Sequence, residues 1–132
     1  MSSIFTKIIN KEIPSHTVAE NENFIAFLDI NPISKGHTLV VPKREIDYYF
    51  DLPDDLLGSL NIFAKKVAEG MKKVIPCNRI GVTVIGLEVP HAHIHLIPID
   101  GIYDMDFGKP KLEMTQEELA EIAAEIGKNV KF

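Results

Sequence analysis

The sequence predicts an α+β fold with an antiparallel sheet, in a single domain over residues 1–132. Short runs with the composition of strands are mostly joined by short polar turns, and such connections pair strands as antiparallel hairpins. Three other segments carry apolar residues three or four positions apart, which is the spacing of a helix with one buried face. The length is that of one ordinary domain, and the chain contains no repeat, low-complexity tract or linker.

The first part of the chain predicts a short helix followed by three strands. Apolar residues at helical spacing over 4–9 predict the helix, which has to end before Pro14. Residues 16–20 and 24–30 are predicted to be strands that a polar turn joins. A loop rich in Asn, Pro and Gly then leads to a third strand over 37–41.

The second part predicts two helices and two further strands. The longest helix covers 54–75, with acidic residues near its N-terminus and lysines near its C-terminus, as the helix dipole favours. Strands are predicted over 80–85 and 91–97. A capping box that begins at Thr115 predicts the final helix, which we expect Gly127 to close.

The composition excludes several classes of function. With 14 Lys and Arg against 19 Asp and Glu, the net charge is −5, so the protein is not a basic one that coats nucleic acid. The sequence has no apolar run near the roughly 20 residues that span a bilayer and no signal-peptide pattern, so we expect no membrane partner. Cys77 is the only cysteine and is expected to be small, apolar and buried. These features favour a cytoplasmic protein whose phosphate site, if present, is small and local.

Three of the five histidines fall within five residues. His91, His93 and His95 alternate with apolar residues, and successive side chains of a strand point to opposite faces. The three imidazoles are therefore expected in a row, about 6.6 Å apart, on a strand that Pro98 ends. The apolar residues between them are expected to pack on a core helix. A solvated strand face would favour Lys, Thr or Glu, so the pattern indicates a functional site, whereas His16 is expected to lie on a surface strand.

Two kinds of chemistry fit such a histidine row. Histidine is the commonest metal ligand, and His-x-His on a strand is a frequent ligand pair. Alternatively, one imidazole attacks phosphorus while its neighbours donate hydrogen bonds to the phosphate oxygens. Histidine suits the second role because its neutral form persists near pH 7.

Four segments of the sequence resemble motifs of one protein family. The motif His-φ-His-φ-His-φ-φ, where φ is apolar, resembles the signature of the histidine triad (HIT) family of nucleotide-binding proteins. Three further segments resemble motifs of that family in the same order and spacing. The four segments are Ile4–Pro14, Phe27–Pro32, Gly36–Lys43 and His91–Ile97. The resemblance covers residues 3 to 98, and little is recognised beyond residue 100.

The resemblance implies a fold and an activity. Family members of this kind have a five-stranded antiparallel sheet with helices packed against it, usually form homodimers, and cleave bonds to the α-phosphate of purine nucleotides without a metal or other cofactor. By motif position, His93 matches the nucleophile, which forms a nucleotidyl-imidazole intermediate. His95 matches the residue that contacts the α-phosphate oxygens. His91 and His37 match the histidines that orient the nucleophile.

The resemblance also implies a nucleotide-binding surface. Asp29 matches the acid that holds the ribose hydroxyls. Five apolar residues match the pocket for the base: Ile4, Phe5, Ile8, Phe27 and Ile30. Glu88 and Val89 match nucleotide-contacting positions before the triad, where the family's Gly-Gln-x-φ appears as Gly-Leu-Glu-Val. Leu87 cannot donate the hydrogen bond of that glutamine, and Glu88 is either an acceptor or acid near the scissile bond or a solvated carboxylate.

Other departures bear on metal binding. Several relatives open with a pair of cysteines that bind zinc together with histidines, and here those positions are Ser3 and Thr6. Glu45 stands where a histidine often follows Pro-Lys-Lys. The joint loss of these ligands argues against structural zinc, so no metal site is expected.

Three functions therefore compete. The first is a HIT-type hydrolase or nucleotidyl transferase acting on a purine nucleotide, whose leaving group is an amine, a phosphate or a second nucleotide. The second is a metal-dependent enzyme built on the histidine cluster, which the long helix fits poorly. The third is a nucleotide-binding regulatory module with negligible turnover, which would use the same residues.

Overall fold

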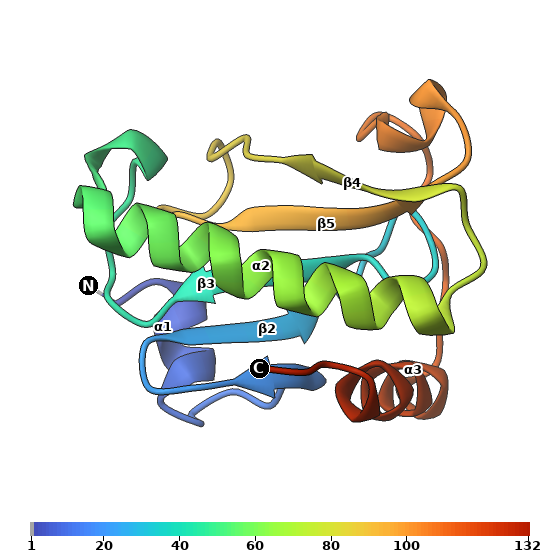
Figure 1. Cartoon of the computed structure of the whole chain (residues 1–132), viewed down its shortest axis with the longest axis horizontal. Helices are drawn as coiled ribbons and strands as arrows, with labels where there is room; N and C mark the ends of the chain where they lie inside the picture. The colour runs from blue at the N-terminus through green and yellow to red at the C-terminus, as the bar shows by residue number, and fades with distance from the viewer. Residues whose placement is uncertain (1) are drawn as a thin grey trace.

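The protein is built on one five-stranded sheet in which all neighbouring strands are antiparallel, in the order β1-β2-β3-β5-β4 (Figure 1). The computed structural model describes residues 2–132. Its helices and strands in chain order are α1 (Ile4–Ile9), β1 (Thr17–Glu20), β2 (Phe24–Leu28), β3 (Thr38–Pro42), η1 (Tyr49–Asp51), α2 (Asp54–Val74), β4 (Arg79–Thr83), β5 (Ile94–Ile99), η2 (Ile102–Met105) and α3 (Gln116–Lys128). The α+β class and the antiparallel sheet predicted from the sequence are confirmed.

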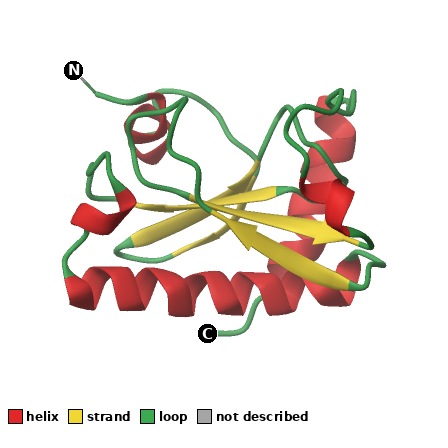
Figure 2. Cartoon of the chain, turned by 90° about the horizontal axis from the view of Figure 1, so that it is seen from above, coloured by secondary structure: helices red, strands yellow, loops and turns green. Residues whose placement is uncertain are grey.

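The sheet is covered on both faces. Figure 2 shows α2 along one face and α1 on the opposite side. Alternate residues of β2 supply the two faces: Phe24, Ala26 and Leu28 join the core beneath α2 and α3, whereas Ile25 and Phe27 join a second apolar cluster with α1. Burial on both faces explains why β2 is a continuous apolar run.

The helix α2 follows its predicted bounds because one face is apolar. Leu60, Phe63, Val67 and Met71 are buried against the sheet at three- and four-residue spacing. Acidic residues occupy its first turn and lysines its last. Among residues 2–132, no helix combines the length and apolarity needed to cross a membrane.

The triad strand differs from its prediction at both ends. The strand β5 begins at Ile94, because the N–H of Ala92 donates to Ile46 in the loop after β3 rather than to a neighbouring strand. Pro98 does not end the strand, and it pairs with Ile80 of β4. The pairing of β5 with β3 stops at Leu96, so at Pro98 the strand has a free edge that requires no N–H.

Three other expectations are also corrected. Gly127 lies inside α3 rather than closing it, and a Cβ there would approach the carbonyl oxygen of Val18 to 2.9 Å, so close packing explains the glycine. His16 lies just before β1, where its Nε2 is 2.7 Å from Oε1 of Gln116. Cys77 is only partly buried.

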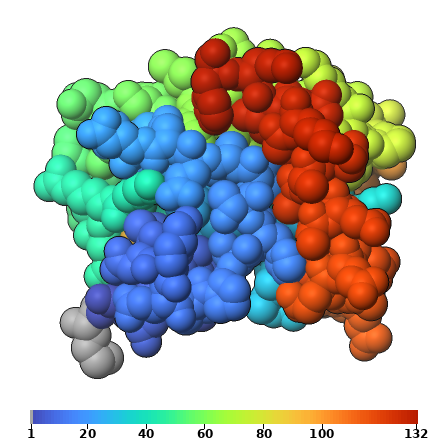
Figure 3. Space-filling view, turned by 90° about the horizontal axis from the view of Figure 1, so that it is seen from below, coloured from blue at the N-terminus to red at the C-terminus, as the bar shows by residue number. Residues whose placement is uncertain are grey.

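Two other strands end earlier than predicted. The strand predicted over 24–30 ends at Leu28, because the Asp29 carboxylate accepts a hydrogen bond from the N–H of Asn31 and begins a turn. The strand predicted over 80–85 ends at Thr83. The C-terminal part of the chain lies beside the N-terminal part in the space-filling view (Figure 3), where α3 packs on β1.

Candidate active site

Four histidines converge at the start of β5. His37, His91, His93 and His95 are all buried, although only His95 lies in a strand. The ring centroids of His93 and His95 are 4.9 Å apart, and those of His37 and His95 are 5.2 Å apart. The bend before β5 therefore draws the rings closer together than the straight row that alternation predicted. The apolar residues between them, Ala92, Ile94 and Leu96, pack in the core beneath α2, as predicted.

The main chain determines which ring nitrogen of His93 carries the proton. Its Nδ1 lies 2.7 Å from the carbonyl oxygen of His91, and a carbonyl oxygen only accepts. Nδ1 therefore carries the hydrogen, and in the neutral ring Nε2 holds a free lone pair. Burial lowers the pKa of His93, which favours that neutral form.

A chain of hydrogen bonds fixes the tautomers of His37 and His95. The N–H of Ile33 donates to Nδ1 of His37 at 3.3 Å, so Nε2 of His37 carries the hydrogen. The Nε2–H of His37 donates to Nδ1 of His95 at 3.0 Å. Nε2 of His95 is therefore protonated and free to donate to a ligand.

The surroundings keep both of these rings neutral. Burial, with a smaller contribution from His95, lowers the pKa of His37 to about 3. Burial, with a smaller contribution from His93, lowers the pKa of His95 to about 4. The site at pH 7 therefore offers one unprotonated nitrogen and one N–H donor rather than a cluster of cations.

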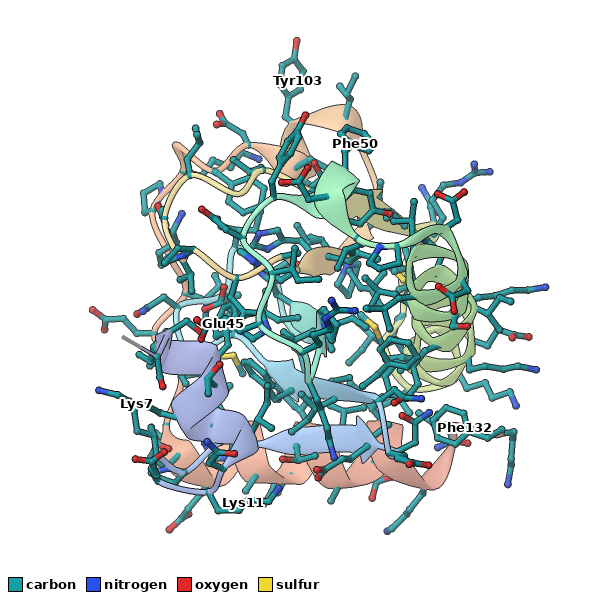
Figure 4. The ribbon with its side chains drawn as sticks, turned by 90° about the vertical axis from the view of Figure 1, so that its left-hand side faces the viewer. Lys7, Lys11, Glu45, Phe50, Tyr103 and Phe132 are labelled. Carbon is teal, nitrogen blue, oxygen red and sulfur yellow. The ribbon has the colours of Figure 1, made fainter. Side chains whose placement is uncertain are left out.

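His91 is held from both sides. Its Nε2 donates to the carbonyl oxygen of Pro42 at 2.8 Å, so its Nδ1 accepts the hydroxyl hydrogen of Ser3 at 2.7 Å. Glu45 accepts hydrogen bonds from the Ser3 N–H and the Thr6 hydroxyl, and it lies beside α1 (Figure 4). Ser3, Thr6 and Glu45, which were predicted to replace zinc ligands, thus form a hydrogen-bonded network around His91.

The residues predicted to hold the base occupy two environments. Phe5, Ile8 and Phe27 are buried in the apolar cluster beneath α1, and Val89 packs against that cluster. Phe5 touches the nucleophile candidate, with its ring centroid 4.9 Å from that of His93. The side chains of Ile4 and Ile30 are 50% and 61% exposed.

Asp29 borders the histidines. Its Oδ2 lies 3.7 Å from Nε2 of His37, and desolvation raises its pKa. It lines a cavity of about 360 Å³ together with residues from four segments of the chain. We call this the polar cavity, and its lining residues are Asp29, Asn31, Ile33, His37, Glu88, His95, Phe107 and Lys111.

The polar cavity also contains a possible set of metal ligands. One ligand atom from each of Asp29, His37 and His95 lies within 4.8 Å of the others. In the arrangement described above, the lone pair of His95 Nδ1 already accepts a hydrogen bond from His37. A metal bound there would have to displace that hydrogen bond.

The segment before the triad is exposed. Glu88 is exposed at the mouth of the polar cavity, and its charge acts on Asp29 and His93, raising the pKa of each as a minor contribution. Leu87 is 88% exposed, so it contributes no donor and little packing.

A second cavity, of about 460 Å³, is lined in part by Ala92 and His93. We call it the aromatic cavity, because Tyr48, Tyr49 and Phe50 form much of its wall, together with Gly86. The ring of Phe50 packs edge-on against both tyrosines. His93 is therefore accessible from a cavity that is largely apolar.

Four lining residues of the polar cavity were not among the predicted site residues, namely Asn31, Ile33, Phe107 and Lys111. Phe107 packs edge-on against His95, with ring centroids 4.9 Å apart, and Lys111 lies near its ring. Phe107 and Lys111 follow residue 100, where no family motif was recognised. An aromatic residue followed by glycine in an otherwise polar stretch was the available signal, and it does not by itself identify a site.

Comparison with known proteins assigns the family. A family model described as HIT domain matches residues 10–102. A HIT-like protein of Methanocaldococcus jannaschii is 48% identical over 100 residues, which cover 72% of this chain and 77% of that protein. The adenosine 5′-monophosphoramidase of Schizosaccharomyces pombe is 34% identical over an alignment that covers 99% of this chain and 100% of that enzyme.

The fold agrees with solved structures of the same family. A HIT-like protein from Bartonella henselae superposes with a TM-score of 0.83 and 32% identity, over 97% of this chain and 96% of that one. The buried histidine cluster and the five-stranded sheet thus occur in a chain that belongs to the histidine triad family.

Proposed function

We propose that the protein cleaves a bond at the α-phosphate of a purine nucleotide through a nucleotidyl-histidine intermediate. The observation that carries this proposal is the hydrogen bond from His93 Nδ1 to the carbonyl oxygen of His91, which leaves Nε2 as a nucleophile. Two activities fit, namely hydrolysis of a nucleoside phosphoramidate or of a dinucleoside polyphosphate. The name of the S. pombe relative supports the first.

The first step forms the intermediate. Nε2 of His93 attacks phosphorus, the bond from phosphorus to the leaving group breaks, and the leaving group departs with the bonding pair and takes a proton from solvent. The imidazole is then a cation, which the carbonyl oxygen of His91 stabilises. Nε2–H of His95 donates to a phosphate oxygen as charge develops there.

The second step regenerates the enzyme. Water attacks phosphorus, the bond between phosphorus and Nε2 breaks, and the water loses its protons to solvent. The nucleoside monophosphate leaves, and His93 returns to its neutral form. If an alcohol or phosphate replaces water, the same chemistry is nucleotidyl transfer.

The test uses metal-stripped protein with adenosine phosphoramidate and with diadenosine polyphosphates. We expect release of AMP that survives chelation, an AMP adduct on His93 by mass spectrometry, and loss of both in His93→Ala. His16→Ala is the matched control and should keep full activity, because His16 lies outside the histidine cluster. Absence of the adduct from a turning-over enzyme would contradict the proposed mechanism.

A metal-dependent enzyme is the second candidate, and the Asp29, His37 and His95 ligand set favours it. It predicts that chelation abolishes activity and that added zinc restores it. A regulatory module predicts saturable AMP binding without turnover.

We also propose that the protein is a cytoplasmic homodimer that pairs through the edge of β4. This strand has one neighbour in the sheet, β5, and Val82 on it is 60% exposed. Phe50 and Tyr103, which are 71% and 77% exposed, project outward from the two short helices η1 and η2 (Figure 4). An open strand edge with exposed apolar side chains nearby favours pairing with a second copy.

A further inference from the structure

The segment 106–112 crosses the candidate active site on its way from η2 to α3. The N–H of Leu112 donates to the carbonyl oxygen of Pro32 at 2.8 Å, which fixes the segment to the loop that follows Asp29. Phe107 packs edge-on against His95, and its ring centroid is 6.0 Å from that of His37. The segment thus forms one wall of the polar cavity.

Lys111 is held in a defined position on this wall. Its Nζ donates to the carbonyl oxygen of Phe107 at 2.7 Å and lies 5.7 Å from the centroid of the same ring. An ammonium group over an aromatic face is attracted by the ring electrons. Within residues 2–132, no carboxylate lies within salt-bridge distance of Lys111.

The charges around the polar cavity give Lys111 a distinct role. His37 and His95 are neutral at pH 7, and Asp29 and Glu88 are the acidic residues of the lining. Lys111 is the single lysine or arginine among the described residues that line the cavity. A dianionic phosphate brought there meets two carboxylates, and without Lys111 no full positive charge would offset them.

We propose that Lys111 binds the phosphate of the nucleotide in the polar cavity, as the cation that compensates its charge beside His95. This inference rests on the proposed function and adds a substrate-binding residue to it. The ammonium keeps two of its three hydrogens available after donating to Phe107, so it can donate to phosphate oxygens without losing its anchor. Its field also acts on Asp29 and His37, lowering the pKa of each, which is consistent with its closeness to both.

The experiment compares AMP with adenosine, two ligands that differ by the phosphate. Isothermal titration calorimetry is done with the wild-type protein and with Lys111→Met, which keeps much of the apolar stem and removes the charge. We expect Lys111→Met to weaken AMP binding about tenfold and to leave adenosine binding unchanged. The AMP dissociation constant should also depend less steeply on salt concentration in the variant.

Lys109→Met is the matched control. Lys109 lies on the same segment and faces Asp104 at 3.8 Å rather than the cavity, so its loss should leave AMP binding at the wild-type value. An equal effect of Lys111→Met on AMP and adenosine, or no effect on either, would overturn the inference while the proposed function stands. Failure of the wild-type protein to bind AMP would overturn both.

Discussion

At the scale of single residues, neighbouring hydrogen-bond donors and acceptors determine which ring nitrogen of each site histidine carries the proton. The peptide groups of Ile33, Pro42 and His91 each fix one nitrogen of a ring. Burial then lowers the pKa of all four histidines, so the site works with neutral imidazoles. Neutral rings suit a nucleophile and a donor, and they leave charge compensation to another group.

These lowered pKa values predict that the protein loses stability in acid. The unfolded chain takes up protons at its histidines near pH 6.5, whereas folded His37 and His95 resist protonation down to about pH 3 and about pH 4. Stability should therefore fall as the pH falls from about 6.5 to about 4, by up to about 1.4 kcal/mol per pH unit for each such group.

Urea unfolding at several pH values checks this expectation with His37→Gln as the comparison. The variant lacks one of the titrating groups, so its stability should depend less steeply on pH between 4 and 6.5. Acidic residues with lowered pKa values contribute a slope of the same sign in both proteins and cancel in the comparison. Identical slopes would show that the buried His37 does not resist protonation.

The convergence of His37, His91, His93 and His95 could be predicted from the sequence, but the relative positions of their rings could not. Alternation placed His91, His93 and His95 on one straight strand face. The peptide of Ala92 instead pairs with a loop, and that long-range hydrogen bond has no signature in the local sequence. Phe107 and Lys111 were missed for a similar reason, since only the fold brings their segment to the histidines.

At the scale of elements, close packing explains residues that local rules assign differently. Gly127 resembles a helix-ending glycine but lies within α3, where a side chain would meet the main chain of β1. The bounds of the long helix α2, in contrast, were predicted almost to the residue, because the periodicity of an amphipathic helix is visible in its own sequence. Strands whose ends depend on contacts with other segments were predicted less accurately.

This packing predicts opposite effects for two glycine substitutions. Gly127→Ala should destabilise the protein by about 1–3 kcal/mol, because its Cβ would come 2.9 Å from the carbonyl oxygen of Val18. Gly58→Ala is the matched control in α2: a Cβ there meets nothing within 4 Å, so the better helix former should stabilise by about 0.5–1 kcal/mol. Urea unfolding measures both, and equal effects would contradict the close approach of α3 to β1.

At the scale of the whole molecule, the two edges of the sheet differ. The edge strand β1 is packed against α3, whereas β4 has exposed apolar and aromatic side chains beside it. The aromatic cavity next to His93 opens near the same side, since η1 and residues 84–86 contribute to its wall. Pairing through β4 would therefore bring a second copy close to the candidate nucleophile.

Val82→Lys should convert the proposed dimer into a monomer. A lysine on a strand edge resists pairing, because its charge must remain in water. Size-exclusion chromatography with light scattering measures the mass of each species. Thr17→Lys, on the other edge strand, is the control and should leave the oligomeric state unchanged, because Thr17 is exposed on β1. A wild-type protein with the mass of one chain would contradict the pairing.

The hydrogen bond from His93 to the carbonyl oxygen of His91 has a consequence for how the site tolerates change. The acceptor belongs to the peptide backbone, so every amino acid at position 91 still supplies it. Random substitution can shift that carbonyl but cannot delete it. The orientation of this candidate nucleophile is thus protected from mutation in a way that a side-chain acceptor, such as the aspartate of a serine protease, is not.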